Sequence, residues 1–262
     1  MSGFSPEWLA LREPADVAAR SARVTRHVLD RLAHHARPTI VDLGCGTGSN
    51  VRYLATRVRS ARWRLIDHDE ALLEVARGQL GADAELQVAN LVSLPHEAFA
   101  GADLVTASAL LDLVSESWLH GFVEQCRESG AAVLAALNYD GRMECHPAEP
   151  EDRLVRDLVN RHQRTDKGFG PALGPDSGAR AAALLGDAGY DVTVERSDWV
   201  LDTATAELQH QLIDGWAHAA IELEPSRSGA IRDWAVRRHA HVAAGHSHIV
   251  VGHDDVGAVL AG

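Results

Sequence analysis

Three alternating glycines in the segment VDLGCGTGSN have the type and spacing of a turn that holds a ligand. Gly44, Gly46 and Gly48 follow a short apolar run, and glycine is used where φ must be positive or where another group touches the backbone. A dinucleotide-binding turn would read G-x-G-x-x-G, whereas here the third glycine comes one residue early. Asp42 would moreover repel a pyrophosphate. The segment therefore predicts a site for a cationic ligand and disfavours NAD.

Short apolar runs that alternate with helical spacing predict a parallel sheet covered on both faces. Strands are expected at 39–44, 63–69, 84–89, 102–108, 131–138, 191–201 and 247–255, and helices at 15–36, 49–58, 70–80, 115–129, 177–189, 203–223 and 226–244. The predicted fold class is α/β, a doubly wound, mostly parallel seven-stranded sheet with helices on both faces. Ligands of such sheets bind outside the carboxyl ends of the strands, where the glycine turn lies.

A long excursion separates the fifth predicted strand from the next core helix. Residues 139–176 are rich in Gly, Pro, Arg and His, and segments of this length between core elements are usually functional. We expect a helical lid insertion here. The chain is predicted to be one domain, 1–262, with a cofactor-binding half at 15–138, the lid or substrate insertion at 139–176 and a C-terminal half at 177–262.

Four features in this order resemble the class I S-adenosylmethionine-dependent methyltransferases. VDLGCGTG matches the family's D/E-x-G-x-G-x-G motif, LIDHD the end of the second strand, VANLVSLP (88–95) the stretch flanking adenine, and ADLVTASALLDLV the fourth strand with its loop. The resemblance covers residues 39–138 and extends to residue 253 through the later helices and the last strand. It implies a Rossmann-like fold, S-adenosyl-L-methionine as cofactor and S-adenosyl-L-homocysteine as product.

The resemblance also implies a role for each matching residue. Asp67, with His68 beside it, would accept both ribose hydroxyls, and Asn90 would bind the adenine amine where the family usually has an acidic residue. Capping of the next helix by Asp67 and turn chemistry at Asn90 are the alternatives. The implied cofactor-binding residues are Asp42, Gly44, Gly46, Gly48, Asp67, His68, Asn90, Leu91 and Ser108.

Methyl transfer from a sulfonium is an in-line displacement, so the enzyme mainly positions the acceptor and excludes water. A base is needed only where the acceptor must lose its proton early. Asp112 follows the fourth strand and would hold or deprotonate the acceptor; the alternative is a solvated loop acid. His162 extends the apolar face of the helix that leads into the lid; the alternative is a structural histidine. These two are the predicted catalytic residues, and the predicted substrate-binding residues are Asn138, Tyr139, Arg142, Gln163 and Lys167.

The charge, the cysteines and the apolar runs of the sequence limit the expected binding partners and cellular location of the protein. With 25 basic and 37 acidic residues the net charge is −12, which disfavours nucleic acid. The three cysteines form no close pair, and no apolar run has the length of a signal peptide or a membrane span, so a cytoplasmic protein is expected. Fifteen histidines show no metal-binding spacing, and no metal is expected. The oligomeric state stays open.

The sequence as a whole predicts an enzyme that moves a methyl group from S-adenosylmethionine to a small polar molecule, at oxygen or nitrogen. The charge disfavours RNA or DNA as acceptor, and a covered site disfavours a folded protein. A protein-modifying methyltransferase is the enzymatic alternative. A non-catalytic subunit that keeps the cofactor fold as a scaffold is the alternative from another class.

Overall fold

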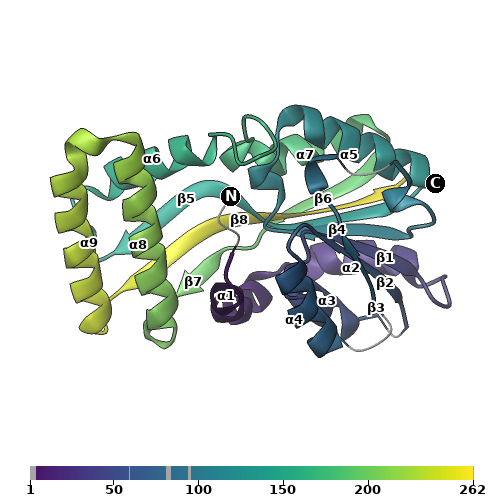
Figure 1. Cartoon of the computed structure of the whole chain (residues 1–262), viewed down its shortest axis with the longest axis horizontal. Coiled ribbons are helices and arrows are strands. Elements are labelled where there is room, and N and C mark those ends of the chain that lie inside the picture. Colours follow the sequence, from purple (N-terminus) through teal and green to yellow (C-terminus); the bar gives the residue numbers. More distant parts are fainter. Residues whose placement is uncertain (1–3, 59, 81–83, 94–95, 262) are drawn as a thin grey trace.

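The computed structural model describes residues 4–58, 60–80, 84–93 and 96–261. Its described strands are β1 (Thr39–Leu43), β2 (Arg62–Asp67), β3 (Ala84–Val88), β4 (Leu104–Ser108), β5 (Ala132–His146), β6 (Tyr190–Arg196), β7 (Trp199–Leu201) and β8 (His248–Leu260). They form one sheet in the order β3-β2-β1-β4-β5-β8-β6, with β7 also paired to β8 (Figure 1). Strands β1 to β5 run parallel, and β8 is antiparallel to its neighbours. This confirms the doubly wound, mostly parallel sheet.

Helices cover both faces of the sheet, as Figure 1 shows. Along β1 every residue is buried, and successive side chains point to opposite faces. Ile40 lies in the core under α2 and α3, whereas Val41 lies in the core under α5 and α7. The helices are α1 (Pro6–Ala19), α2 (Ala22–Leu32), α3 (Ser49–Ala55), α4 (Glu70–Leu80), α5 (Glu116–Ser129), α6 (Asp152–Gln163), α7 (Ser177–Asp187), α8 (Ala206–Leu223) and α9 (Ser228–Ala243). Short 3-10 turns are η1 (Leu91–Ser93), η2 (His96–Phe99), η3 (Leu111–Leu113), η4 (Gly174–Asp176), η5 (Thr203–Thr205) and η6 (Pro225–Arg227).

The helix predicted at 15–36 is in fact two helices, because the chain turns at Arg20 and Ser21. Arg20 ends α1 with φ −54° and ψ 131°. The hydroxyl of Ser21 accepts the N–H of Val24 and so caps α2. The N–H of Ser21 donates to the buried carboxylate of Asp255 on β8 (2.8 Å). The turn is therefore fastened to the central sheet.

The strand predicted at 191–201 is divided into β6 and β7, so the described sheet has eight strands rather than seven. The division falls at Ser197 and Asp198. The carboxylate of Asp198 accepts two bonds from Arg142 on β5 (2.8 and 2.6 Å) and one from the N–H of His253 on β8 (3.2 Å). The N–H of Ser197 donates to the carbonyl of His253 (2.8 Å). These hydrogen bonds hold the segment between β6 and β7 against β5 and β8.

Strands β5 and β8 extend past the parallel strands and carry a second core (Figure 1). Residues 139–146, predicted as the start of the lid, belong to β5 and pair with β8. The helical insertion after the fifth strand therefore begins later, at α6. Helices α6, α8 and α9 pack on the extension around Trp216 and Trp234, and α1 packs against the same core through Trp8 and Leu11.

The cysteines and the helix lengths bear on the expected location of the protein. Cys45, Cys126 and Cys145 are buried and unpaired. In the part of the chain that the structure describes, no helix combines the length and the apolar character needed to cross a bilayer. The cytoplasmic location stays a prediction.

Candidate cofactor and acceptor site

The glycine turn lies where the strand order reverses, between β1 and its neighbours β2 and β4. Gly44, Gly46 and Gly48 have φ of +61°, +52° and +82°, a region that other residues enter only with strain. The N–H of Gly44 donates to the carbonyl of Ile66 (2.8 Å), which holds the turn against β2. A Cβ at Gly48 would lie 2.8 Å from a side chain of α4. The positive φ angles predicted for these glycines are confirmed.

The carboxylate of Asp67 is buried and fixed at the end of β2. Its Oδ2 accepts the N–H of Gly46 (2.8 Å), and its Oδ1 accepts the N–H of Asp69 (3.0 Å). The cap of α4 is Asp69, whose Oδ1 accepts the N–H groups of residues 71 and 72, so helix capping does not explain Asp67. Each carboxylate oxygen keeps a lone pair for a hydroxyl. His68 is half-exposed, with Nδ1 3.2 Å from Asp67 Oδ1.

A chain of buried polar side chains runs behind the glycine turn. Asn50 Nδ2 donates to Asp42 Oδ1 (2.7 Å) and Thr106 Oγ1 (3.1 Å), and Asn50 Oδ1 accepts from Arg20 Nη1 (2.8 Å). Within the described residues Asp42 Oδ2 has no hydrogen-bond partner. Burial raises the pKa of Asp42 to about 7, although the Asn50 hydrogen bond and the Arg20 charge act in the opposite direction. A bound cation would therefore stabilise the ionised carboxylate.

The predicted adenine neighbours follow β3. Asn90 Oδ1 accepts the N–H of Val92 (3.0 Å), which is the turn chemistry that the sequence left open, and its second lone pair stays available. Leu91 is buried, and its Cδ1 lies 3.6 Å from the position of a Cβ on Gly44. Residues 94–95, at the end of the matching stretch, lie outside the described residues. The roles of Asn90 and Leu91 toward adenine stay predictions.

Backbone strain gathers at the carboxyl ends of β4 and β5. Ala109 and Leu137 have positive φ of 52° and 55° without being glycine. Their N–H groups donate to the carbonyl of Ala136 (2.9 Å) and to Asp255 Oδ1 (2.8 Å). Such strain persists where surrounding structure holds it, often at functional sites. Ser108, predicted at the methionine end of the cofactor, directly precedes Ala109 and lines a small pocket at this edge.

Asp112 lies in η3, directly after β4, and is buried, so the alternative of a solvated loop acid is wrong. Among the described residues its Oδ1 has no hydrogen-bond partner. Burial raises the pKa of Asp112 to about 6, while its own backbone N–H and the charges of Arg12 and Lys167 lower it. A carboxylate with this pKa can accept a proton near neutral pH.

Asn138 and Tyr139 end the parallel part of β5 but are bound to other protein groups. Asn138 Nδ2 donates to the carbonyls of Ala135 (3.0 Å) and Asp254 (2.9 Å), while its Oδ1 is without a partner in the described part of the chain. The hydroxyl of Tyr139 donates to Asn160 Oδ1 on α6 (2.7 Å). The amide oxygen of Asn138 is thus the polar atom of this pair that is left for a ligand.

Arg142 does not have the geometry predicted for it. Its guanidinium forms ion pairs with Asp140 and Asp198, and the Asp198 hydrogen bonds raise its pKa further. Two carboxylates already neutralise the charge, so pairing with an anionic substrate is not supported. The residue instead joins β5 to the β6–β7 break.

The predicted lid residues meet at the end of α6. His162 is partly buried, with Nε2 3.2 Å from Glu222 Oε2 on α8 and Nδ1 3.2 Å from Lys167 Nζ. Burial and the Lys167 charge lower the pKa of His162, so its neutral form is favoured. Lys167 in turn lies close enough to Asp112 for the two charges to interact. Gln163 is half-buried beside them. His162 thus contacts α8 through Glu222 and is linked to Asp112 through Lys167.

Sequence reasoning missed a polar cluster that α1 brings to the same region. Arg12 binds Asp16 through two bonds (2.9 and 3.1 Å) and lies 4.9 Å from the ring centroid of Trp199. The ring of His253 packs on Trp199 (5.1 Å), and burial lowers the pKa of His253 to about 3. The available signal was the step of four residues from Trp8 through Arg12 and Asp16.

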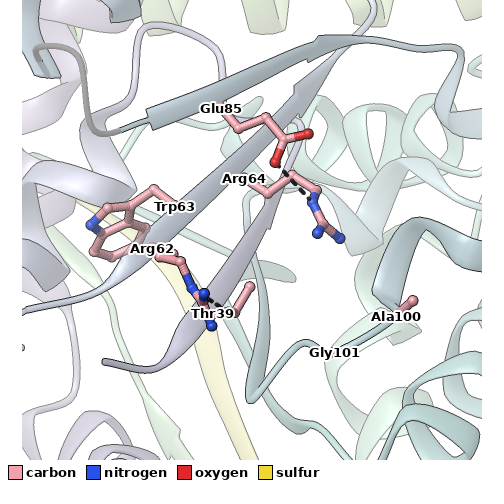
Figure 2. Close-up of a pocket in the computed structure, with 7 residues that line it drawn as sticks. All are labelled: Thr39, Arg62, Trp63, Arg64, Glu85, Ala100 and Gly101. Carbon is pink, nitrogen blue, oxygen red and sulfur yellow. Dashed lines mark hydrogen bonds and ion pairs between the residues drawn. The ribbon is translucent and has the colours of Figure 1, made fainter. Parts of the chain in front are cut away.

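A second pocket lies at the opposite, amino-terminal edge of the sheet and has no free buried polar atom for a ligand among its described lining residues. This pocket of about 370 Å³ opens at the amino ends of β1 and β2 (Figure 2). Its Arg62 donates to Thr39 Oγ1 (3.3 Å), and its Arg64 donates to the carbonyl of Ala98 (2.9 Å). No buried polar atom among its described lining residues lacks a partner. Within the described ranges no group of three His, Cys, Asp or Glu side chains is arranged for a metal.

Comparisons of the sequence agree with this arrangement. A family model described as a methyltransferase domain matches residues 40–130, which contain the glycine turn, Asp67 and Asp112. Trans-aconitate 2-methyltransferase of Paracidovorax citrulli is 32% identical over 170 residues, which cover 64% of this chain and 60% of that protein. The enzyme of the same name from Acidovorax sp. strain JS42 is 30% identical over 168 residues, 63% of this chain and 59% of that protein. The chain spans about three fifths of the length of these relatives.

Solved structures show the same fold. The YcgJ protein of Bacillus subtilis superposes with a TM-score of 0.52 at 13% identity, over 92% of this chain and 100% of that one. Phosphoethanolamine N-methyltransferase 2 of Haemonchus contortus, solved with phosphomonomethylethanolamine and S-adenosylhomocysteine, also has a TM-score of 0.52 at 13% identity, over 100% of this chain and 59% of that one. At such identities the likeness shows the Rossmann-like fold alone.

Proposed function

We propose that this chain, which belongs to the class I S-adenosylmethionine-dependent methyltransferases, transfers the methyl group of S-adenosylmethionine to a small polar molecule. One observation carries the proposal: three glycines with positive φ form a turn at the edge where the strand order reverses, and the N–H of Gly46 in this turn donates to the buried Asp67. The unpartnered oxygen of Asp42 beside them suits a ligand with positive charge. These features together fit a sulfonium cofactor that has a ribose.

The groups around the glycine turn match the parts of S-adenosylmethionine. The glycines let the ligand approach the backbone, the free lone pairs of Asp67 would accept the ribose hydroxyls, and Asp42 would face the cationic end. When bound, the cofactor supplies a methyl group on a sulfonium that is a good leaving group. The residues proposed to hold it are Asp42, Gly44, Gly46, Gly48, Asp67, His68, Asn90, Leu91 and Ser108.

We place the acceptor beside Asp112. Its unpartnered oxygen would orient the acceptor or take its proton, and burial beneath the lid residues would exclude water. Arg12 and Lys167 add positive charge next to it. A small di- or tricarboxylic acid is therefore the substrate class that the charges favour, and the similarity to trans-aconitate 2-methyltransferases points to the same class.

The division of the chain follows from this proposal. Residues 15–138 would form the cofactor-binding half and 177–262 the C-terminal half. Of residues 139–176, the part from α6 onward would form the insertion that covers the acceptor, because 139–146 belong to β5. In support, the returning end of the insertion is bonded to the segment that follows Asp112: the N–H of Leu173 donates to the carbonyl of Val114 (2.8 Å). This contact holds the cover close to the acceptor wall.

The test is transfer of a labelled methyl group from S-adenosylmethionine to trans-aconitate and a panel of other di- and tricarboxylic acids. Labelled product should form with the wild-type chain and be strongly reduced in Asp67→Ala at subsaturating cofactor. Label on added proteins but on no small molecule would instead indicate a protein-modifying enzyme. A chain that binds no cofactor would be a scaffold, and the proposal would be wrong.

A further inference from the structure

His253 is a buried histidine on β8 with an imidazole nitrogen that has no partner. The residue is 6% exposed, and within the described part of the chain its Nδ1 forms no hydrogen bond. Burial and the Arg12 charge lower the pKa of His253 to about 3, whereas Asp198 and the backbone of Val251 act in the opposite direction. The ring is therefore neutral near neutral pH, with one N–H group and one lone pair.

Packing alone does not account for a histidine at this position. The ring centroid lies 5.1 Å from that of Trp199 and 6.2 Å from that of Tyr139, which pairs with His253 across β5 and β8. A phenylalanine would fill such an aromatic layer without burying a polar nitrogen, and an unpaired buried polar group is destabilising. The polar nitrogen therefore indicates a partner that binds from outside the chain.

The ring lies beside the proposed acceptor site. Tyr139 is at the carboxyl end of the parallel part of β5, and η3, which contains Asp112, packs against this strand. The carboxyl group of Asp112 is near enough to the Tyr139 hydroxyl for the two to interact electrostatically. Arg12 is likewise near enough to interact with both His253 and Asp112. Side chains from α1, β5, β8 and η3 thus lie together in one region.

Trp199 positions Arg12 next to His253. The guanidinium of Arg12 lies 4.9 Å from the ring centroid of Trp199, on which His253 also packs. Asp16 accepts from Arg12 Nε (2.9 Å) and Nη2 (3.1 Å), and it also accepts from Trp199 Nε1 (3.0 Å). These bonds fix the guanidinium and do not use its Nη1. A cation and a neutral N–H donor that are held by one indole are complementary to the oxygens of a carboxylate.

We propose that His253 is a specificity-determining residue of the acceptor site and donates a hydrogen bond from Nδ1 to a carboxylate oxygen of the small acid. The inference rests on the proposed function. It assigns a substrate contact to the last strand, outside the residues 40–130 that the family model matches. A neutral donor suits this place, because it binds an anion without adding another buried charge beside Arg12.

The test is steady-state methyl transfer to the acid of the above panel that the wild-type chain methylates best, with calorimetry of S-adenosylmethionine on the same proteins. His253→Phe keeps the aromatic packing and removes the nitrogen. It should raise the KM for the acid about 10- to 150-fold, the range for a lost hydrogen bond to a charged group, and leave kcat within about threefold. Cofactor affinity should stay within about twofold. His253→Asn places an amide nitrogen near the position of Nδ1 and should recover most of the lost affinity for the acid.

His248→Phe is the matched control. His248 lies on the same strand, is partly buried and packs near His146 (6.3 Å between ring centroids), with which it pairs across β5 and β8. This variant should keep the wild-type KM, kcat and cofactor affinity. An unchanged KM for the acid in a folded His253→Phe would overturn the inference. A loss of cofactor affinity as large as the rise in KM would overturn it too, since His253 would then only hold the structure.

Nitrogen-15 NMR of the wild-type chain gives a readout that needs no folded variant. The imidazole of His253 is identified as a ring that stays neutral at pH 5. With S-adenosylhomocysteine bound, addition of the acid should shift its Nδ1 resonance, and an unmoved resonance would overturn the inference. A wild-type chain that methylates no acid of the panel would instead refute the proposed function, and the inference with it.

Discussion

The affinity for S-adenosylmethionine should rise with pH, because the site contains a carboxyl group that is only partly ionised at neutral pH. Burial raises the pKa of Asp42 to about 7; the Asn50 hydrogen bond and the Arg20 charge lower it, and the Asp67 charge raises it. The cofactor is positively charged at its sulfonium. It therefore binds the ionised form of Asp42 better than the neutral form, and binding below pH 7 should release a proton.

The size of the effect follows from the pKa. With a value of about 7, roughly one tenth of Asp42 is ionised at pH 6 and roughly nine tenths at pH 8. If only the ionised form binds, the affinity at pH 6 is about tenfold lower than at pH 8, or about 1.4 kcal/mol. Asp42→Asn keeps an oxygen for Asn50 but does not titrate. Its affinity should be low and nearly constant over this range.

The assay is calorimetric titration from pH 5.5 to 8.5 in buffers with different ionisation enthalpies, which reports proton release together with affinity. The imidazole of His68 contacts Asp67 (Nδ1 to Oδ1, 3.2 Å) and is the nearby group that must be controlled. His68→Asn should keep the pH dependence. Equal wild-type affinity at pH 6 and pH 8, or a slope that survives in Asp42→Asn, would refute the reasoning.

Four further outcomes are expected. Asp67→Ala should weaken S-adenosylmethionine binding by about 1.5–3 kcal/mol through lost hydrogen bonds to a carboxylate, and unchanged affinity by calorimetry would contradict its ribose role. Burial raises the pKa of Asp112 to about 6, so if this residue is a base, turnover should rise as the pH increases through about 6. Asp112→Asn should then lower kcat and remove this pH dependence, whereas for a purely binding role it should mainly raise KM. His162→Ala should slow methyl transfer with cofactor affinity nearly intact, since its ring contacts Lys167 of the insertion and Glu222 of α8 and no predicted cofactor-binding residue, and loss of cofactor binding would argue against that placement. Gly257→Ala would put a Cβ 2.8 Å from a valine of α2 and should cost about 1–3 kcal/mol in urea unfolding, while Gly186→Ala, in open space on α7, should be neutral or stabilising.

Local patterns made much of the site predictable. The three glycines directly follow β1, and Asp67 ends the neighbouring strand β2. Once these strands are recognised in the sequence, the glycines and Asp67 are expected at the same carboxyl edge of the sheet. The buried strands of the parallel sheet appear in the sequence as short apolar segments, so they can be predicted without the structure. The same reading placed Asp112 after β4 but could not show that it is buried.

Predictions were wrong where distant residues set the local structure. The single helix at 15–36 is interrupted because Ser21 binds Asp255, 234 residues away. The strand at 191–201 divides where Asp198 binds Arg142 of β5, and this same pair removes Arg142 from the substrate-binding residues. The spacing of apolar residues does not predict hydrogen bonds between side chains that are far apart in the sequence.

The sequence by itself determined the fold class and the glycine turn, because these depend on backbone conformation and on apolar periodicity over short stretches. The resemblance to the methyltransferase family rests on short motifs that are likewise visible in the sequence. Only the tertiary structure decided which polar atoms are buried without a partner. Arg20, Asn50 and Asp42 meet because α1 and α2 fold over the sheet, and Arg12 nears Asp112 for the same reason. Burial and pairing depend on every group that surrounds an atom, and most of those groups come from distant parts of the chain.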